Sequence, residues 1–586
     1  MRPTLLVAAI IALPALATVT PAHAHAQVRD SVPARDSARV RDTTRVVLPR
    51  AVAREVVELF NASATLRAIG PYTLDSAAVV EGDLAVLDGP VVLAGHVTGR
   101  VVAINADVAL RPGARVRGDL VVVGGTLSAS EGATVHGATR VYEARLAYRE
   151  EGDHIVPLDS AVGIAQFEEW FGRLLERRER SGVRFTVGSG KTYNRVEGLP
   201  VHVGPAYTDR FTWGEVHAAA LGVLRTADGA RWDSENLGHL ARAELRLGVA
   251  RGLVLGGRLF DEVRPVEEWH LGADEVGLAS FFFHRDYRDY FGAHGGALYA
   301  GLFAGPDAEI EAYLADERWT SRAARDPFSL FRNGAPWRPN PEADEGSFHV
   351  AGVTLRVDTR NLPDATRSGL FVTAEYERGT GRVTRFGALS PGVRETDDPR
   401  VTYGRGFLDV RSYNRVAPDA QVNLRMVLGG WLHGDPLPAQ RRLSVGGAGT
   451  LPGFDFREHA GGADLGQCST SGVPAGSPAQ CDRVILLQGE YRGDMRANIL
   501  GDLDPAGKWT RPTQWVAFVN TGRGWLVGDG AAGPLAVRGA RLPGLSSFRA
   551  DVGVGIDIGI LGMYVAKSVS DPDRGANFHI RLRDRF

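Results

Sequence analysis

The last ten residues of the chain alternate between apolar and polar side chains. The apolar set is Phe578, Ile580, Leu582 and Phe586, and the polar set is His579, Arg581, Arg583 and Arg585. A period of two predicts a strand with one apolar and one charged face. Arginines on one face and a terminal aromatic on the other favour the closing strand of an outer-membrane barrel over a soluble sheet. In such a barrel the apolar face meets lipid and the charged face lines a polar lumen.

The same alternation recurs through most of the chain. Between Phe548 and Gly559, apolar residues of one parity alternate with Arg549, Asp551, Asp557 and glycines of the other. Charges on the second face would be costly in a dry core but are favourable in a wet lumen. Counting such segments predicts a mainly-β fold: a transmembrane antiparallel β-barrel of about 16 strands over residues 183–586.

The N-terminal segment predicts export. Residues 1–26 combine a basic start, an apolar run from Leu5 to Val19 and small residues around His25, as a cleaved signal peptide does. No cysteine lies near the cleavage site, so a lipid anchor is not expected. No later segment reaches the roughly 20 apolar residues of a spanning helix, and strands in lipid must close on themselves. We therefore expect the bacterial outer membrane, with the N-terminal part in the periplasm.

Three segments are expected between the signal and the barrel. Residues 27–68 have the polar composition of a disordered linker, with a short helix at Ala51–Phe60. Residues 69–147 repeat Gly-x-Val/Leu-x-Val motifs at Gly82, Gly99 and Gly118, with a spacing of 17 to 19 residues. This pattern resembles the bactofilin-type β-solenoids, and the alternative is a small β-sandwich. Residues 158–182 predict an amphipathic helix packed on the solenoid.

One loop motif narrows the barrel family. Residues 443–454 read LSVGGAGTLPGF and precede five strand-like segments. The motif residues are Gly446, Gly447, Leu451, Pro452, Gly453 and Phe454. The loop and the five ordered strands resemble the inward loop and following strands of the bacterial surface antigen, or outer-membrane assembly-factor, barrels. Upstream, Leu355–Asn361 resembles another family strand and Tyr193–Leu199 resembles the family's first barrel segment.

The chain departs from the family pattern at the loop. The resemblance implies an arginine before Gly-Phe that reaches carboxylates on the lumen wall, but Pro452 stands there. Asn520 replaces the usual aspartate of the wall, whereas the wall carboxylate Glu490 is present. Arg457, five residues after Pro452, is the expected substitute for the missing arginine. The repeated polypeptide-transport domains that precede assembly-type barrels are also absent from the sequence pattern, which suggests a specialised relative.

The other candidate sites are sparse. Phe281–Tyr290 packs aromatics beside charges, and we expect an interfacial aromatic girdle there. Histidines show no metal-ligand spacing, so no catalytic residue, metal or cofactor is expected and the chain is not expected to be an enzyme. Cys468 and Cys481, the only cysteines, are expected to form a disulfide in an oxidising compartment. A net charge of −2 gives no nucleic-acid footprint.

Two functions of different classes remain open. The resemblance implies a barrel that assists insertion or translocation of proteins or other envelope molecules, with unfolded outer-membrane or exported proteins as substrates. The alternative is a non-catalytic envelope anchor or passive pore, whose periplasmic solenoid binds a scaffold. Outer-membrane lipids are the expected surroundings in both cases.

Overall fold

The computed structural model describes residues 48–586, with interruptions. Residues 158–181, 361–365, 388–397, 456–480, 496–512 and 528–543 lie outside the description, as do positions 49, 143, 147, 152–153, 190, 230, 249–250, 306, 418, 559–560 and 583–584. The expected signal peptide, most of the linker and the amphipathic helix at 158–182 therefore lie outside the described residues, apart from Gly182.

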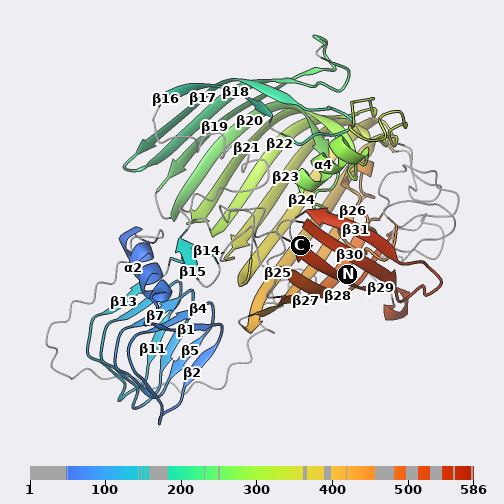
Figure 1. Ribbon diagram of the computed structural model, residues 1–586. Coiled ribbons are helices and arrows are strands. Elements are labelled where there is room, and N and C mark those ends of the chain that lie inside the picture. Colours follow the sequence, from blue (N-terminus) through green and yellow to red (C-terminus); the bar gives the residue numbers. More distant parts are fainter. Residues whose placement is uncertain are drawn as a thin grey trace. The chain divides into compact units, whose positions relative to one another are not determined.

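The N-terminal part is a parallel β-solenoid with three faces (Figure 1). The first sheet contains β1 (Leu66–Ile69), β4 (Leu84–Leu87), β7 (Val101–Ile104), β10 (Leu120–Val123) and β13 (Thr139–Tyr142). The second contains β2 (Tyr72–Leu74), β5 (Val91–Leu93), β8 (Val108–Leu110) and β11 (Leu127–Ala129). The third contains β3 (Val79–Val80), β6 (His96–Val97), β9 (Arg115–Val116) and β12 (Thr134–Val135). The expected solenoid is confirmed.

Each coil stacks on the next in a fixed register. Leu84 pairs with Val101, and Val101 with Leu120, so equivalent positions recur at the spacing seen in the sequence. At the corners, Asp83 Oδ1 accepts a hydrogen bond from Arg100 N at 2.7 Å, and Asp119 Oδ1 accepts one from Ala138 N at 2.8 Å. These carboxylates satisfy amides of the following coil that would otherwise be unpaired at the bend. The Arg100 side chain also bonds Asp83 and lowers the pKa of that carboxyl.

Helix α2 (Arg50–Asn61) covers the outer face of the first sheet. Its apolar side chains Val56 and Phe60 pack with Leu87 and Ile104, so both faces of β4 and β7 are buried. The hairpin of β14 (Tyr148–Glu151) and β15 (His154–Pro157) packs in the same cluster. A sequence that is apolar at successive residues within a short strand thus marks a strand with two buried faces.

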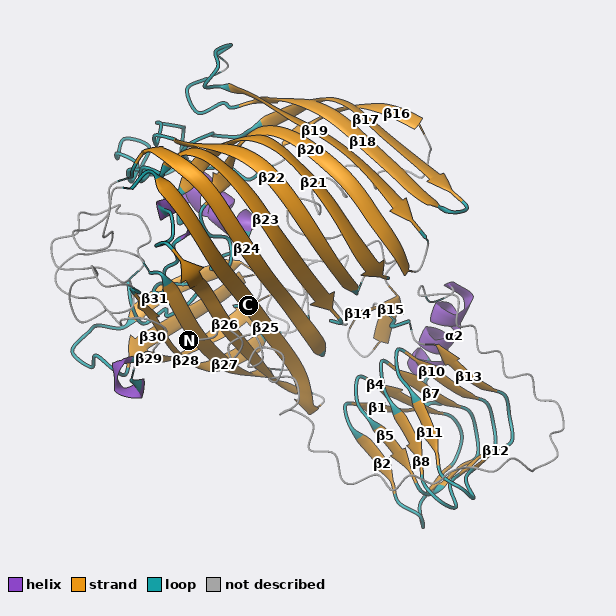
Figure 2. Ribbon diagram, turned by 180° about the vertical axis from the view of Figure 1, so that it is seen from behind, coloured by secondary structure: helices purple, strands orange, loops and turns teal. Residues whose placement is uncertain are grey.

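The remaining strands of the described residues form one continuous antiparallel sheet of 16 strands in sequence order. They are β16 (Gly182–Ser189), β17 (Val201–Phe211), β18 (Gly214–Leu224), β19 (Leu237–Leu247), β20 (Arg251–Pro265), β21 (Tyr290–Ala304), β22 (Ala308–Ser321), β23 (Glu345–Asp358), β24 (Gly369–Arg385), β25 (Arg400–Ala417), β26 (Ala420–Gly434), β27 (Arg483–Asp494), β28 (Gln514–Trp525), β29 (Arg549–Ile558), β30 (Leu561–Ser568) and β31 (Asn577–Leu582). Figure 2 shows the sheet curving as a wall, as a barrel wall does. The expected strand number and mainly-β fold class are confirmed.

The two faces of the curved sheet have opposite chemistry. On the outer face, Leu298 is 70% and Leu314 66% exposed, whereas the inner face buries charged side chains such as Glu377 and Arg425. A soluble sheet would have the reverse arrangement, because water would meet the charges. An exposed apolar face around a charged interior is the arrangement of an outer-membrane barrel wall.

The longest connections lie at one end of the sheet and the shortest at the other. Residues 266–289, 322–344 and 435–482 connect strands at one end, whereas residues 212–213 and 418–419 connect strands at the other. We refer to these as the long-loop end and the short-turn end. In the part of the chain that the structure describes, no helix combines the length and the apolar character needed to cross a membrane.

Candidate functional site

Ion pairs line the inner face of the sheet. Asp409 on β25 lies 2.7 Å from an Arg411 guanidinium nitrogen and 2.8 Å from one of Arg425. Arg425 Nη2 in turn donates to the carbonyl of Trp269, in the connection between β20 and β21. Glu377 likewise binds Arg441, which lies in the connection after β26. Buried pairs of this kind fix position more than they add stability, and here they fix two inward connections against the wall.

One inward connection is residues 435–482, between β26 and β27. Its residues 435–455 contain the glycine-rich motif and are called the lumen loop below. It begins with the 3₁₀ turn η2 (Ala439–Arg441) and closes on itself, because Gly446 N donates to Thr450 Oγ1 at 2.8 Å and Gly447 N to Leu451 O at 3.1 Å. Gly446 and Gly447 have φ values of 128° and 90°, which favour glycine. Gln488 on β27 donates to the Thr450 carbonyl and holds the turn on the wall.

The tip of the lumen loop contacts the last strands. Gly453 N donates to Asp551 Oδ2 on β29 at 2.8 Å. A Cβ at Gly453 would lie 2.6 Å from the Asp551 Cβ and 2.8 Å from Ser568 N, so only glycine allows this approach. The Pro452 carbonyl lies 3.2 Å from Asn577 Nδ2 and 2.7 Å from His579 Nε2, both on β31. The position where the family has an arginine thus contributes a backbone acceptor to the last strand.

Apolar packing anchors the same tip. Leu451 is fully buried and Phe454 is 1% exposed, in a cluster with Leu443 and Val484. The guanidinium carbon of Arg574 lies 5.3 Å from the Phe454 ring centroid. An arginine over an aromatic ring adds a cation–π attraction to the burial of the ring. The motif residues Gly446, Gly447, Leu451, Pro452, Gly453 and Phe454 therefore lie together in one buried loop.

The second inward connection carries helix α4 (Ala273–Phe283) and meets the lumen loop at β31. Glu267 Oε1 accepts from Ser444 Oγ at 2.8 Å, which joins the two connections. Glu275 on α4 binds Arg581 of β31 at 2.6 Å, and Arg581 Nη1 also donates to Ala448 O at 3.0 Å. The inner side of β31 is therefore held by both connections at once.

The wall residues Glu490 and Asn520 have a partner that the sequence pattern did not indicate. Arg585 Nη1 lies 3.4 Å from Glu490 Oε2, and Arg585 Nη2 donates to Asn520 Oδ1 at 3.1 Å. The Arg585 guanidinium also lies 3.6 Å from the Phe518 ring centroid. The wall carboxylate that the resemblance pairs with a loop arginine is thus bound here by an arginine from beyond the last strand. Arg457, the expected substitute, lies outside the described residues.

The expectation that Phe586 faces lipid is wrong. Phe578 and Ile580 are 62% and 57% exposed on the outer face, and Leu582 is half-buried, but Phe586 is only 8% exposed. The Phe586 carbonyl accepts from Tyr413 Oη of β25 at 2.8 Å. Strand β31 ends at Leu582, so the alternation of the strand does not determine which face of the sheet Phe586 lies on. The contact with Tyr413 holds it at the inner face.

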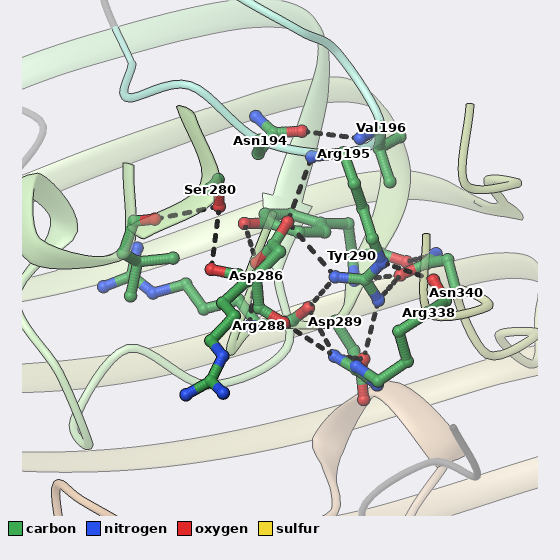
Figure 3. A network of polar contacts seen from close by, with 12 residues as sticks. Asn194, Arg195, Val196, Ser280, Asp286, Arg288, Asp289, Tyr290, Arg338 and Asn340 are labelled. Atoms are coloured by element: carbon green, nitrogen blue, oxygen red, sulfur yellow. Dashed lines mark hydrogen bonds and ion pairs between the residues drawn. The ribbon is translucent and has the colours of Figure 1, made fainter. Parts of the chain in front are cut away.

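The expectation that Tyr193–Leu199 belongs to the first barrel strand is wrong. Tyr193–Leu199 is the turn between β16 and β17 and not a first barrel strand, because Asn194 Oδ1 caps the amides of Val196 and Glu197 at 3.0 and 2.8 Å. Figure 3 shows Arg195 surrounded by polar groups from two other connections, residues 266–289 and 322–344. The guanidinium lies 3.2 Å from Asp286 and 3.0 Å from Asp289, and both side chains are buried.

The segment Phe281–Tyr290 supplies those carboxylates, so it is not an interfacial girdle. Phe281 to Phe283 end helix α4, and the following residues turn inward to Arg195 (Figure 3). Burial lowers the pKa of Arg195, but Asp286 and Asp289 outweigh it and raise that pKa above its ordinary value. The arginine is therefore charged, and it ties the first turn of the sheet to the α4 connection. Alternation is missing from this segment, which is the signal that it is not a strand.

The first and last strands are the edges of the sheet. Among the described residues, no backbone ladder joins β16 to β31. Both edges carry outward apolar side chains: Phe185 on β16 is 69% exposed, as Phe578 and Ile580 are on β31. The edge of β31 is thus apolar outside and is held by the lumen loop and α4 inside.

The sequence indicated some contacts of this region and missed others. Asp551 was identifiable as a charge on the polar parity of its strand, and Arg581 and Arg585 as charges on the inner face. Glu275 carried no signal, since its helix has no strand periodicity. Cys481 is disulfide-bonded, and Cys468 lies outside the described residues, so their pairing stays a prediction.

Comparison with known proteins gives distant similarity. No family model matches the chain. BamA from Haemophilus ducreyi, in a form lacking POTRA domains 1–3, is 14% identical over 69% of each chain with a TM-score of 0.40. CdiB from Escherichia coli is 11% identical over 71% of this chain and 69% of its own, with a TM-score of 0.29. Glutamate–tRNA ligase 2 of Maricaulis maris (strain MCS10) is 22% identical over 308 residues, 46% of this chain and 62% of the ligase.

These similarities are too distant to assign an activity, and the chain spans less than two thirds of the ligase. The architecture itself is established by the strand order. The described residues form an N-terminal β-solenoid followed by a 16-stranded antiparallel sheet with an exposed apolar outer face and a charged inner face, which is the arrangement that the resemblance to the outer-membrane assembly-factor barrels implies.

Proposed function

We propose that this protein assists the insertion or translocation of proteins across the outer membrane, using the edge between β16 and β31. The observation that carries the proposal is the edge itself: β31 has no ladder to β16 among the described residues, and its inner side is bound by the lumen loop and α4. The inner contacts hold β31 in place, whereas its backbone edge toward β16 has no ladder among the described residues. Such an edge suits the addition of another strand.

The physical driving force is backbone hydrogen bonding. An unpaired strand edge presents free N–H and C=O groups, and such groups are costly where lipid replaces water. An incoming extended segment would satisfy them by adding a strand. The outward apolar residues Phe185, Phe578 and Ile580 place both edges at lipid depth, where this gain is largest.

The orientation follows from the connections. Bacterial barrels place short turns in the periplasm and longer loops outside the cell. β16 begins and β31 ends at the short-turn end, so the proposal places the N-terminal solenoid in the periplasm. No catalytic step or cofactor is part of the proposal. The substrate class is a protein with extended or strand-forming segments.

Crosslinking the two edges tests the proposal. Single cysteines at Phe185 or Val187 on β16, combined with one at Phe578 or Ile580 on β31, would be joined in cells by a thiol-specific crosslinker. Val187 and Val203 are paired neighbours within the β16–β17 hairpin, so the double variant Val187→Cys/Val203→Cys is the matched control that leaves the edge free.

The proposal predicts that locking the β16–β31 edge reduces the outer-membrane level of a defined set of proteins, whereas the hairpin control does not. Unchanged levels in cells where most of the protein is crosslinked would refute it. That second result would favour an envelope anchor or passive pore, with the solenoid as a scaffold-binding module.

A further inference from the structure

The outer face of β20–β24 changes from apolar to charged toward the long-loop end. The strand register places Leu255, Ala300, Ala312 and Val353 in one outward row. Two rows further toward the long loops stand Asp316, His349 and Thr380, and the next row contains His294, Arg318 and Arg382. This order matches the change from lipid tails to headgroups across half of a bilayer.

A groove lies where the two chemistries meet. It extends over the outer face of β19–β24 and has a volume of about 820 Å³. This volume is within the range of ligand sites in proteins, about 300–1,000 Å³. Gly257, Gly296 and Ala351 form a floor of small residues, and Leu298 and Leu314 form apolar walls. The depth of the groove depends on these small residues, because a Cβ in place of the Gly257 hydrogen would lie 3.0 Å from Leu298 Cδ2.

Arginines whose side chains have no partner lie in and beyond the groove. Arg378 lines it in the same outward row as Leu298 and Leu314, and Arg318 and Arg382 share one outward row two rows further toward the long loops. All three side chains are exposed, and within the described part of the chain none of them makes a hydrogen bond or ion pair. Asp316 is the one carboxylate that lines the groove, and it lies 3.7 Å from His349. The charge at this side is therefore positive overall.

We propose that this groove binds a lipid with an anionic phosphate headgroup. The apolar walls and the small-residue floor take an acyl chain, because this face already lies against lipid tails. The phosphate lies at Arg378, since guanidinium groups bind phosphate through charge-assisted hydrogen bonds. Arg318 and Arg382, two outward rows further toward the long loops, add positive charge on the headgroup side. A protein partner would need to bury these three cations, which is costly without matching carboxylates. The site is independent of any transport step at the sheet edge.

Native mass spectrometry of the full chain in non-ionic detergent tests the site. The protein is titrated with dimyristoyl phosphatidylglycerol, with phosphatidylcholine of the same chain length, and with inorganic phosphate. The variants are Arg378→Gln, which removes the headgroup contact, and Ala351→Phe, which fills the groove. Lys567→Gln is the matched control, because Lys567 is an exposed cation on the outer face of β30, away from the groove.

The first phosphatidylglycerol should bind at least several-fold more tightly than phosphatidylcholine, and inorganic phosphate should not compete at equal concentration. Arg378→Gln should weaken that first binding event about tenfold, as loss of one charged hydrogen bond does, and Ala351→Phe should weaken binding of both lipids. Lys567→Gln should have no effect. Equal binding of the two lipids, equal effects of Arg378→Gln and Lys567→Gln, or competition by inorganic phosphate would each overturn the proposal.

Discussion

Arg585 is expected to be a principal anchor of the residues that follow β31. Its guanidinium binds Glu490 and Asn520 and lies on the Phe518 ring, all on the inner face of the sheet. Replacing Arg585 with alanine removes these three contacts together. It leaves Glu490 with Arg492 at 2.7 Å and Asn423 at 2.8 Å, so this carboxylate is not left without partners.

The magnitude follows from these contacts. Removing one partner of a buried ion pair costs about 3–5 kcal/mol, most of it from the charge left behind. Because Glu490 keeps Arg492, we expect the lower end, about 3 kcal/mol, of which about 1–2 kcal/mol is the cation–π contact with Phe518. Arg585→Lys keeps the charge but loses the planar stacking and the two-pronged hydrogen bonding, and should cost about half as much.

The assay is urea unfolding of the full chain in lipid vesicles, with Arg585→Ala, Glu490→Gln and the double variant. A double-mutant cycle should give a coupling free energy of about 1–2 kcal/mol between the two residues. Arg385→Ala is the control: Arg385 is 54% exposed and pairs with the exposed Glu342, so its loss should cost less than about 1 kcal/mol. A coupling below about 0.3 kcal/mol, or equal effects of Arg585→Ala and Arg385→Ala, would refute the assignment of Arg585 as the partner of Glu490.

Three further results are expected. Gly453→Ala should release the lumen loop from β29, since its Cβ would overlap Asp551, and protease cleavage within 435–455 should become faster while the barrel stays folded. Asp83→Ala should speed hydrogen exchange of the Arg100 amide by several-fold, because the amide loses its acceptor. In the unaltered protein, the ionised Asp83 carboxylate should protect this amide from exchange. Because the pKa of Asp83 is lowered, the protection is complete above about pH 4 and is lost as the pH falls through the pKa of the folded state. Thiol labelling of denatured, unreduced protein should find no reactive cysteine, whereas two reactive thiols would exclude a Cys468–Cys481 disulfide.

Local periodicity was sufficient for the two β architectures. In the solenoid, a glycine at each corner, followed by aspartate at Asp83 and Asp119, and branched residues between the corners repeat with the coil, so the stacked strands follow from the spacing. In the barrel wall, alternation separates Leu314 from Glu317 before any partner strand is known. Both patterns act within one strand or one coil, where sequence neighbours are also neighbours in space.

Alternation gave a wrong answer where a strand had ended. Phe586 keeps the parity of Phe578 and Ile580, yet it is buried and its carbonyl contacts Tyr413, because β31 ends at Leu582 and Phe586 is not part of a strand. Tyr193–Leu199 failed for a related reason: its resemblance to a strand segment was outweighed by the Asn194 cap and the buried Arg195. The connections, and not the strands, were the parts that the sequence could not place.

Local patterns in the sequence predicted a solenoid, a wall of about 16 strands and the polar face of each strand, and the resemblance to the assembly-factor barrels singled out the glycine-rich loop after β26. The contacts inside the wall are visible only in the fold: Pro452 contacts β31 through its carbonyl, Glu275 of α4 pairs with Arg581, and Arg585 binds the wall residues Glu490 and Asn520. The physical reason is that strand faces follow from hydrogen bonding and side-chain direction along the backbone. A charge inside a barrel, by contrast, can be neutralised from any connection that reaches it, at any distance along the chain.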